Sequence, residues 1–397
     1  QHTFICSYYI HIYMQIIVDP LRFFTSYLGV NPSYGCNNGC GYCMLEKDIP
    51  NPSKVRRITT PKTTLELLIN DGKVTKTSPL AFYNLSDPFH KENVSDLLQI
   101  LEGLEKAGQE NIIALITKLN PEKTAPEHDA LKRISELESL RPVIVVSYAN
   151  VSEKIEPPSK NERIKLMANA KMLGIPVVHY ARPLFHGWTS EEKVIEMAKE
   201  TSGIVDSVVI GGIKLEKGIR ARLEKRGVEM PPYKDDDGRK IDRKFMEFVV
   251  HTYNKMNPEL GVFYNTSCGI SNALKISHYM GYQWNFSLNN KSGYCKKPCN
   301  AEQRERCGEA EPPIKSYREN QNETPEYREM RRAEERKVQV WLKTFGINRA
   351  MYVIKHGYIN LFADVTSKER QRMTQHLGMF VRTKYQIRTM KNIEQVF

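Results

Sequence analysis

Residues 34–43 of the chain, Tyr34-Gly35-Cys36-Asn37-Asn38-Gly39-Cys40-Gly41-Tyr42-Cys43, contain three cysteines with the spacing C-x3-C-x2-C. Three thiolates at this spacing, with an aromatic residue before the third, can bind three irons of a [4Fe-4S] cluster. The fourth iron then keeps an open coordination site, which the amino and carboxylate groups of S-adenosylmethionine (SAM) can chelate. A zinc site and three chance cysteines are the alternatives. Zinc usually takes four protein ligands and paired C-x2-C motifs, and no partner motif lies nearby in the sequence.

Short apolar runs alternate with amphipathic helical patterns from residue 27 to about residue 265. The apolar runs predict strands at Tyr27–Val30, Leu80–Asn84, Ile112–Thr117, Val143–Tyr148, Pro176–Tyr180 and Ser207–Ile210. The stretches between them predict helices near residues 61–70, 93–107, 127–139, 160–173 and 190–201. Six βα units in a row predict a parallel sheet with right-handed crossovers. The expected fold class is therefore α/β, a partial (β/α)6 TIM-like barrel.

In barrels of this kind the chemistry takes place at the C-terminal ends of the strands. The cysteine loop lies there, directly after the first expected strand. Polar residues follow the other strands: Ser86 and Asp87 after the second, Lys118 after the third, Ser147 in the fourth and Arg182 after the fifth. Hydroxyl groups and cations suit a cofactor that carries a carboxylate, an ammonium group, a ribose and an adenine. Together these residues predict one cofactor pocket at the barrel mouth.

The cysteine motif resembles the signature of the radical SAM superfamily. Several further segments resemble its spore photoproduct lyase-like branch, over roughly residues 27–215: residues 30–36, 86–89, 116–118, 145–147, 174–177 and 181–183. The resemblance implies that Tyr42 packs near the adenine, and that Ser86, Asp87, Lys118 and Ser147 lie around the methionine and ribose of SAM. Lyases of this branch have a cysteine hydrogen donor close after the motif, whereas residues 44–47 here are Met-Leu-Glu-Lys, so thymine-dimer reversal is not implied.

A second set of cysteines consists of Cys268, Cys295, Cys299 and Cys307. The surrounding sequence is rich in glycine, proline and charged residues, a composition that does not suit the burial of four thiols in an apolar core. Four thiolates without disulfides indicate an auxiliary [4Fe-4S] cluster or a structural zinc, and we favour iron–sulfur. Because the cysteines of the chain cluster in this way, we expect a reducing, cytoplasmic location. No run of about 18 apolar residues is present, so no membrane span is expected.

The chain of 397 residues has a net charge of +12, of which +8 lies in residues 325–397. This excess indicates either a solvated helical face or a surface for a polyanion such as nucleic acid. We divide the chain into five parts: an N-terminal segment (1–26), the radical SAM barrel (27–260), a cysteine-rich auxiliary metal region (261–310), a linker (311–324) and a small basic α+β appendage (325–397).

These patterns predict an enzyme that cleaves SAM reductively at a [4Fe-4S] cluster, giving a 5′-deoxyadenosyl radical that removes hydrogen from a substrate. The candidate substrates are a nucleic acid and, as the alternative, a small molecule or peptide. An electron donor such as a flavodoxin or ferredoxin is the expected partner. The alternative outside the enzymes is a non-catalytic, zinc-containing nucleic-acid-binding protein.

Overall fold

The computed structural model describes the following residues: 20–24, 26–45, 52–70, 74, 79–215, 217–230, 236–278, 299–308, 325–347, 350–355, 358–366, 369–370, 373, 377 and 380–383. Cys295, the expected linker at 311–324 and most of the N-terminal segment lie outside these residues.

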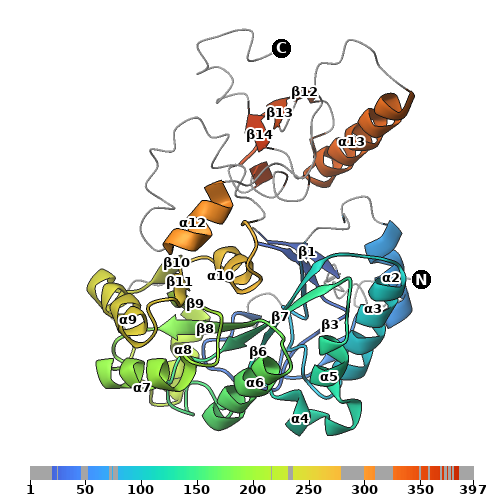
Figure 1. The fold of residues 1–397 in the computed structure, drawn as a ribbon. Coiled ribbons are helices and arrows are strands. Elements are labelled where there is room, and N and C mark those ends of the chain that lie inside the picture. The colour runs from blue at the N-terminus through green and yellow to red at the C-terminus, as the bar shows by residue number, and fades with distance from the viewer. Residues whose placement is uncertain are drawn as a thin grey trace, which may run out of the picture.

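The six strands expected from the sequence are present, and each pairs with the next in parallel (Figure 1). They are β2 (Leu28–Val30), β5 (Leu80–Phe82), β6 (Ile112–Thr117), β7 (Arg141–Ser147), β8 (Val177–Leu184) and β9 (Ser207–Leu215). Three further strands of this same sheet were not expected: β11 (Gly261–Phe263) joins β9 in parallel, whereas β1 (Leu21–Phe23) and β10 (Asp236–Lys240) pair antiparallel with β2 and β9. The α/β class and the largely parallel sheet are therefore confirmed.

The strand boundaries differ from the expected ones for local reasons. The second strand ends early because Tyr83 has a left-handed backbone, with φ +58°. The last strand runs on through Gly211 to Leu215. A Cβ at Gly211 would lie 2.3 Å from Nε of Arg182, so the absence of a side chain lets this guanidinium lie across the strand.

Helices connect the parallel strands, and most of them pack along the outer side of the curved sheet (Figure 1). They are α2 (Pro61–Asn70), α3 (Val94–Lys106), α4 (Pro121–Thr124), α5 (Ala130–Ser135), α6 (Lys160–Met172), α7 (Glu191–Thr201), α8 (Lys217–Lys225) and α9 (Arg243–Met256). The helix expected at 127–139 is instead a 3-10 turn, η1 (Pro126–His128), followed by α5, because Asp129 between them is left-handed. No described helix is long and apolar enough to cross a membrane.

Alternate residues of each strand face two separate apolar layers, as the period of a strand requires. On β6, Ile113 and Leu115 pack with the outer helices, whereas Ile112 and Ala114 face the inner side of the sheet. Helix α10 (Thr266–Ala273) contributes Ile270 to that inner layer. The sheet is therefore buried on both faces, which leaves its strand ends as the place for polar residues.

The C-terminal part forms a small α+β unit of its own. Strands β12 (Met351–Lys355) and β13 (Tyr358–Phe362) form an antiparallel hairpin, and β14 (Phe380–Thr383) pairs with β13 in parallel. Helix α13 (Pro325–Thr344) buries Val338, Trp341 and Leu342 in the same apolar cluster as this sheet. Their spacing of three and four residues places them on one face of the helix.

A buried histidine links three elements of the barrel. His179 on β8 is fully buried; its Nε2 lies 2.8 Å from the carbonyl oxygen of Tyr148, and its Nδ1 lies 3.0 Å from the hydroxyl of Tyr253. Burial lowers the pKa of His179 to about 4. The ring is therefore neutral in the folded protein at neutral pH, with Nε2 donating and Nδ1 accepting.

This histidine predicts a pH dependence of stability. Between pH 6.5 and pH 4 the unfolded chain binds a proton at His179 that the folded protein does not, so the free energy of unfolding falls as the pH falls. From pH 7.5 to pH 5 we expect His179 to account for a loss of about 2 kcal/mol. Urea unfolding at both pH values should show a smaller loss for His179→Gln than for the wild type. Equal losses in the two proteins would contradict the assignment.

Candidate active site

The cysteine loop begins directly after β2, at the C-terminal edge of the parallel sheet. The short strands β3 (Ser33–Tyr34) and β4 (Arg56–Arg57) pair at its base. Gly35 has φ +89°, and a Cβ there would lie 2.1 Å from the carbonyl oxygen of Lys54. Only glycine therefore fits directly before Cys36.

The loop after β5 holds the start of the cysteine loop. The backbone N–H of Gly35 donates to the carbonyl of Leu85 at 2.7 Å, and the hydroxyl of Ser86 donates to the carbonyl of Gly35. Asn93 in turn donates from Nδ2 to Oγ of Ser86 at 3.0 Å. Ser86, expected near SAM, thus has a direct role in shaping the cysteine loop.

Asp87 joins the cysteine loop to β6. Its buried carboxylate accepts hydrogen bonds from Nδ2 of Asn38 at 3.2 Å, from Oγ1 of Thr117 at 2.7 Å and from the backbone N–H groups of Phe89 and Lys118, both at 3.0 Å. Burial raises the pKa of Asp87, and the hydrogen bonds oppose this shift. Asp87 therefore connects three separate segments at the mouth.

The three motif cysteines are free, half-buried thiols. Burial raises the pKa of Cys36, and it raises that of Cys40 to about 11, while Lys118 and Arg163 act in the opposite direction on Cys40. The negative charges of Asp87, Cys40 and Cys43 further raise the pKa of Cys36. A metal that binds here must displace the thiol protons.

The donor set fits a [4Fe-4S] cluster. Within the part of the chain that the structure describes, no three Cys, His, Asp or Glu side chains converge on one point as ligands of a single metal ion. A cluster needs no such point, because each thiolate binds a different iron. Three thiols from one short loop, fixed at both ends, meet that requirement.

A cavity of about 150 Å³ opens beside the cysteine loop. Tyr42 and Met44 line it from the loop, and residues at the ends of β6, β7, β8 and β9 complete it: Lys118, Ser147, Tyr180, Arg182, Pro183, Gly212, Ile213 and Lys214. Four of the six residues expected to bind SAM meet here, namely Tyr42, Lys118, Ser147 and Arg182. Ser86 and Asp87 lie outside this lining and hold the cysteine loop instead.

Lys118 connects the cavity wall to the cysteine loop. Its Nζ donates to Oγ of Ser147 at 2.9 Å and lies 5.6 Å from the centre of the Tyr42 ring. The hydroxyl of Tyr42 donates to Oε2 of Glu156 at 2.7 Å. Burial lowers the pKa of Lys118, but the negative charges of Glu156 and Cys40 outweigh it, and the net shift is upward. Lys118 is therefore a positive charge at the cavity.

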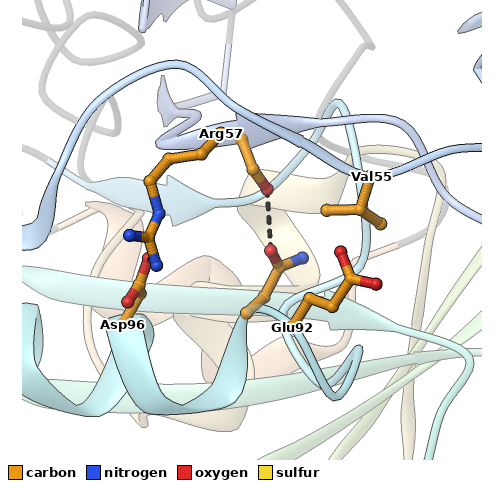
Figure 2. Close-up of a pocket in the computed structure, with 6 residues that line it drawn as sticks. Val55, Arg57, Glu92 and Asp96 are labelled. Atoms are coloured by element: carbon orange, nitrogen blue, oxygen red, sulfur yellow. Dashed lines mark hydrogen bonds and ion pairs between the residues drawn. The ribbon is translucent and has the colours of Figure 1, made fainter.

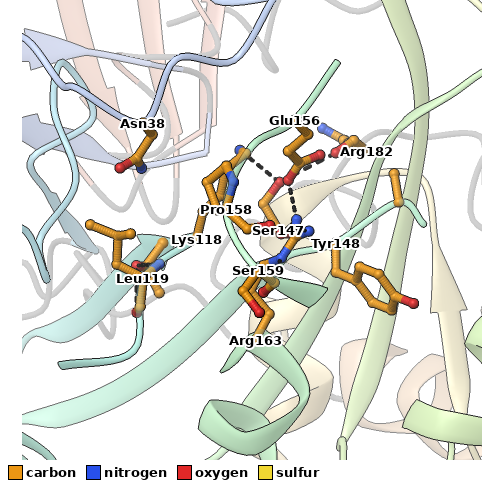
Figure 3. Close-up of polar contacts among 12 residues, drawn as sticks. Asn38, Lys118, Leu119, Ser147, Tyr148, Glu156, Pro158, Ser159, Arg163 and Arg182 are labelled. Carbon is orange, nitrogen blue, oxygen red and sulfur yellow. Dashed lines mark hydrogen bonds and ion pairs between the residues drawn. The ribbon is translucent and has the colours of Figure 1, made fainter. Parts of the chain in front are cut away.

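A buried ion pair lies under this wall (Figure 3). Glu156 and Arg163 are both almost completely buried and form an ion pair. Arg163 also donates from Nη1 to the carbonyl oxygen of Ser147 at 3.1 Å, and its guanidinium carbon lies 5.1 Å from the centre of the Tyr148 ring. The sequence analysis missed both residues. The signal available was a glutamate before two prolines, in the loop that follows the expected strand Val143–Tyr148.

Arg182 is fixed by contacts on three sides. Its Nη1 donates to the hydroxyl of Tyr180 at 2.6 Å, and its Nη2 donates to the carbonyl oxygens of Tyr264 at 2.6 Å and Ile210 at 3.2 Å. The guanidinium carbon lies 4.4 Å from the centre of the Tyr180 ring. The charge of this buried side chain is therefore held in one place beside the cavity.

The second set of cysteines is described in part. Cys268 on α10 and Cys299 both pack against the inner apolar layer of the sheet. Cys307 on α12 (Ala301–Gly308) accepts from the backbone N–H of His278 at 3.2 Å and from Nε2 of Gln303 at 3.3 Å. Cys268 and Cys299 therefore lie on the side of the sheet that α10 covers, and Cys307 contacts the segment that follows α10.

A second cavity, of about 450 Å³, lies between the β3–β4 hairpin and the start of α3 (Figure 2). Arg57 and Asp96 form an ion pair of 2.7 Å across it, and Val55 and Glu92 line it further along. It shares no lining residue with the cavity beside the cysteine loop. None of the residues expected to bind the cofactor lies here.

Solved structures of two known proteins are similar to this chain. A mutant spore photoproduct lyase with bound AdoMet and dinucleoside spore photoproduct is 13% identical, with a TM-score of 0.47 over 62% of this chain and 79% of that chain. SuiB of Streptococcus suis, bound to S-adenosylmethionine, is 14% identical, with a TM-score of 0.41 over 62% of this chain and 53% of that chain. SuiB is also known bound to its precursor peptide SuiA, with 15% identity and a TM-score of 0.42 over 64% of this chain and 52% of that chain.

Both known proteins have S-adenosylmethionine bound in these structures. No family model matches the chain. No curated protein matches it in sequence. Since the structural likenesses have TM-scores below 0.5, we base the proposed function on the residues of the site.

The buried ion pair predicts a large effect of one substitution. Arg163→Met leaves the carboxylate of Glu156 buried without its cation, and we expect it to lower the free energy of unfolding by about 3 kcal/mol. Lys160→Met, on the same helix, breaks two more exposed pairs, with Glu196 and Glu200, and should cost less than about 1 kcal/mol. Urea unfolding of both variants measures the difference. Similar costs for the two would refute the role of the buried pair.

Proposed function

We propose that this protein is a radical SAM enzyme in which Cys36, Cys40 and Cys43 hold a [4Fe-4S] cluster and the adjacent cavity holds SAM. When bound, the cluster supplies an electron for the reductive cleavage of SAM, which leads to hydrogen abstraction from the substrate. The observation that carries the proposal is the juxtaposition of two features: a loop with three free thiols, and a cavity lined by Lys118, Ser147 and Arg182.

The cations of the cavity suit the carboxylate of SAM. Lys118 has a raised pKa and stays protonated at neutral pH, and its hydrogen bond to Ser147 fixes its direction. Arg182 adds a second charge held by four contacts. We assign these two side chains and Ser147 to the carboxylate and ribose of SAM, and the ring of Tyr42 to the adenine. Preoriented charges of this kind bind a ligand without reorganising.

The layer below the cavity keeps water out. Glu156, Arg163 and Ser147 are buried. Glu156 pairs with Arg163 and accepts a hydrogen bond from Tyr42. Ser147 accepts hydrogen bonds from Lys118 at its hydroxyl and from Arg163 at its carbonyl. A site that handles a reactive radical needs such a closed floor, because loose side chains would compete with the substrate for it. In this proposal the protein binds, orients and encloses, and the cofactor carries the chemistry.

Loss of the motif cysteines should abolish the activity. Replacement of Cys36, Cys40 and Cys43 together by Ala removes the thiolates that bind the cluster, so anaerobically reconstituted protein should form no 5′-deoxyadenosine from SAM under reducing conditions. Cys6→Ala, which removes a thiol outside the motif, is the matched control and should leave product formation unchanged. Product formation by the triple variant at the wild-type rate would sink the proposal.

We further propose that Cys268, Cys295, Cys299 and Cys307 bind a second centre, a [4Fe-4S] cluster in preference to zinc. Cys268 and Cys299 pack against one apolar cluster on the inner side of the sheet, and Cys307 contacts His278 in the segment after α10. A centre held by four thiolates has no open iron, so electron relay or a structural role suits it.

The second centre should be independent of the first. The triple Ala variant at positions 36, 40 and 43 should therefore still contain about four irons per chain, the content of one [4Fe-4S] cluster. Iron and zinc analysis of the reconstituted variant measures this. One tightly bound zinc and no iron would show that the iron–sulfur assignment is wrong and that the centre is structural.

For the substrate we propose a nucleic acid first, since residues 325–397 have a net charge of +8, which suits a polyanion. A small molecule or peptide is the alternative substrate within the same chemistry. The electron would come from a flavodoxin or ferredoxin. Metal analysis separates the enzyme from a zinc-containing nucleic-acid-binding protein, since the enzyme with both clusters holds about eight irons and the binding protein holds zinc.

A further inference from the structure

Helix α8 packs against the cysteine loop, far from it in sequence. Ile219 and Leu223 of this helix are buried in an apolar cluster that also contains Ile155 from the loop after β7. Tyr42 and Met44 of the cysteine loop pack against the same cluster. Helix α8, which follows β9, therefore forms part of the surface against which the cysteine loop packs.

Two arginines of this region hold the carbonyl groups of the loop. Arg222 donates from Nη2 to the carbonyl oxygen of Cys43 at 2.5 Å and from Nε to that of Gly41 at 3.4 Å. Arg226, just after the helix, donates from Nη1 to the carbonyl oxygen of Gly39 at 2.7 Å and to that of Lys154 at 3.2 Å. The bonded carbonyls flank Cys40 and include Cys43 itself.

The approach of α8 to the loop is as close as the backbone permits. A Cβ at Gly41 would lie 2.5 Å from Cδ2 of Leu223 and 3.4 Å from Nη1 of Arg226. The backbone N–H of Gly41 donates to the carbonyl oxygen of Ile155 at 2.8 Å. The second half of the motif is therefore held on both sides, by Ile155 and by the two arginines.

The charges of Arg222 and Arg226 also matter for what the loop binds. Guanidinium groups stay protonated at all physiological pH values. A [4Fe-4S] cluster with three thiolates gains negative charge on reduction, and positive charge near such a cluster favours the reduced form. Glu156, whose carboxylate accepts a hydrogen bond from Tyr42 of the same loop at 2.7 Å, acts in the opposite direction.

We propose that Arg222 and Arg226 are positioning residues that hold the Cys40–Cys43 half of the loop in its ligating conformation and make the bound cluster easier to reduce. The first part concerns the protein without its cofactor. The second part rests on the proposed function, because it requires the cluster at Cys36, Cys40 and Cys43.

The apo protein tests the first part through amide hydrogen exchange. In the double variant Arg222→Met/Arg226→Met, the Gly41 and Cys43 amides should exchange roughly tenfold faster, the factor expected when a hydrogen bond to a charged group is lost. Lys225→Met, which removes an exposed cation next to Arg226, is the matched control and should not change these rates. The Gly35 amide, bonded to Leu85 at the other end of the loop, should exchange as in the wild type.

The reconstituted protein tests the second part through the midpoint potential of the motif cluster, followed by electron paramagnetic resonance during a redox titration. The potential should be more negative in the double arginine variant than in Lys225→Met. Exchange rates and a potential equal to those of Lys225→Met would overturn the proposal. A wild type that binds no cluster at the motif would refute the proposed function and the second part, while the exchange rates would still decide the first.

Discussion

One buried carboxylate determines how the mouth of this barrel is built. Asp87 accepts hydrogen bonds from the cysteine loop, from its own turn and from the end of β6, through Asn38, Phe89, Thr117 and Lys118. A buried carboxylate is tolerable only when donors replace its water, so these segments can pack only in the arrangement that supplies all four bonds. The backbone N–H of Lys118 is one of the donors. This hydrogen bond fixes the backbone position of Lys118, directly after β6, and so the point from which its side chain extends. The cysteine loop and the cavity wall therefore share one anchor.

The cavity floor shows a similar dependence on pairing. Burying Glu156 and Arg163 is costly, and the cost is offset only because each is bonded to the other and to fixed neighbours. The pair fixes the positions of the side chains at the cavity, since Tyr42, Ser147 and Lys118 all contact this pair or one another. Polar groups that are already oriented can stabilise a charged cofactor without moving.

Much of the barrel could be predicted because its information is local. The run Ile112–Thr117 has the composition of a buried strand, and the parallel order of six such runs follows from the helices between them. The cysteine spacing and the rule that function gathers at strand ends placed Lys118, Ser147 and Arg182 at one mouth, and they do line one cavity.

The missed features depend on contacts between distant segments. The pairing of Glu156 with Arg163 requires a particular path of the loop after β7, and Arg222 reaches the loop carbonyls across about half of the chain. No periodicity or motif reports such contacts. The break at Asp129 and the early end at Tyr83 are left-handed residues that are not glycine, which sequence patterns do not single out.

The open iron is the central claim, and the most direct measurement is the electron paramagnetic resonance spectrum of the reduced, reconstituted protein before and after SAM is added. Three thiolates from one loop leave one iron free for the amino and carboxylate groups of SAM, so we predict that SAM shifts the spectrum of the motif cluster. Lys118→Met should require more SAM for the same shift, because it removes a cation from the cavity. An iron–sulfur spectrum that saturating SAM leaves unchanged, or a protein that binds zinc and no iron, would contradict the account.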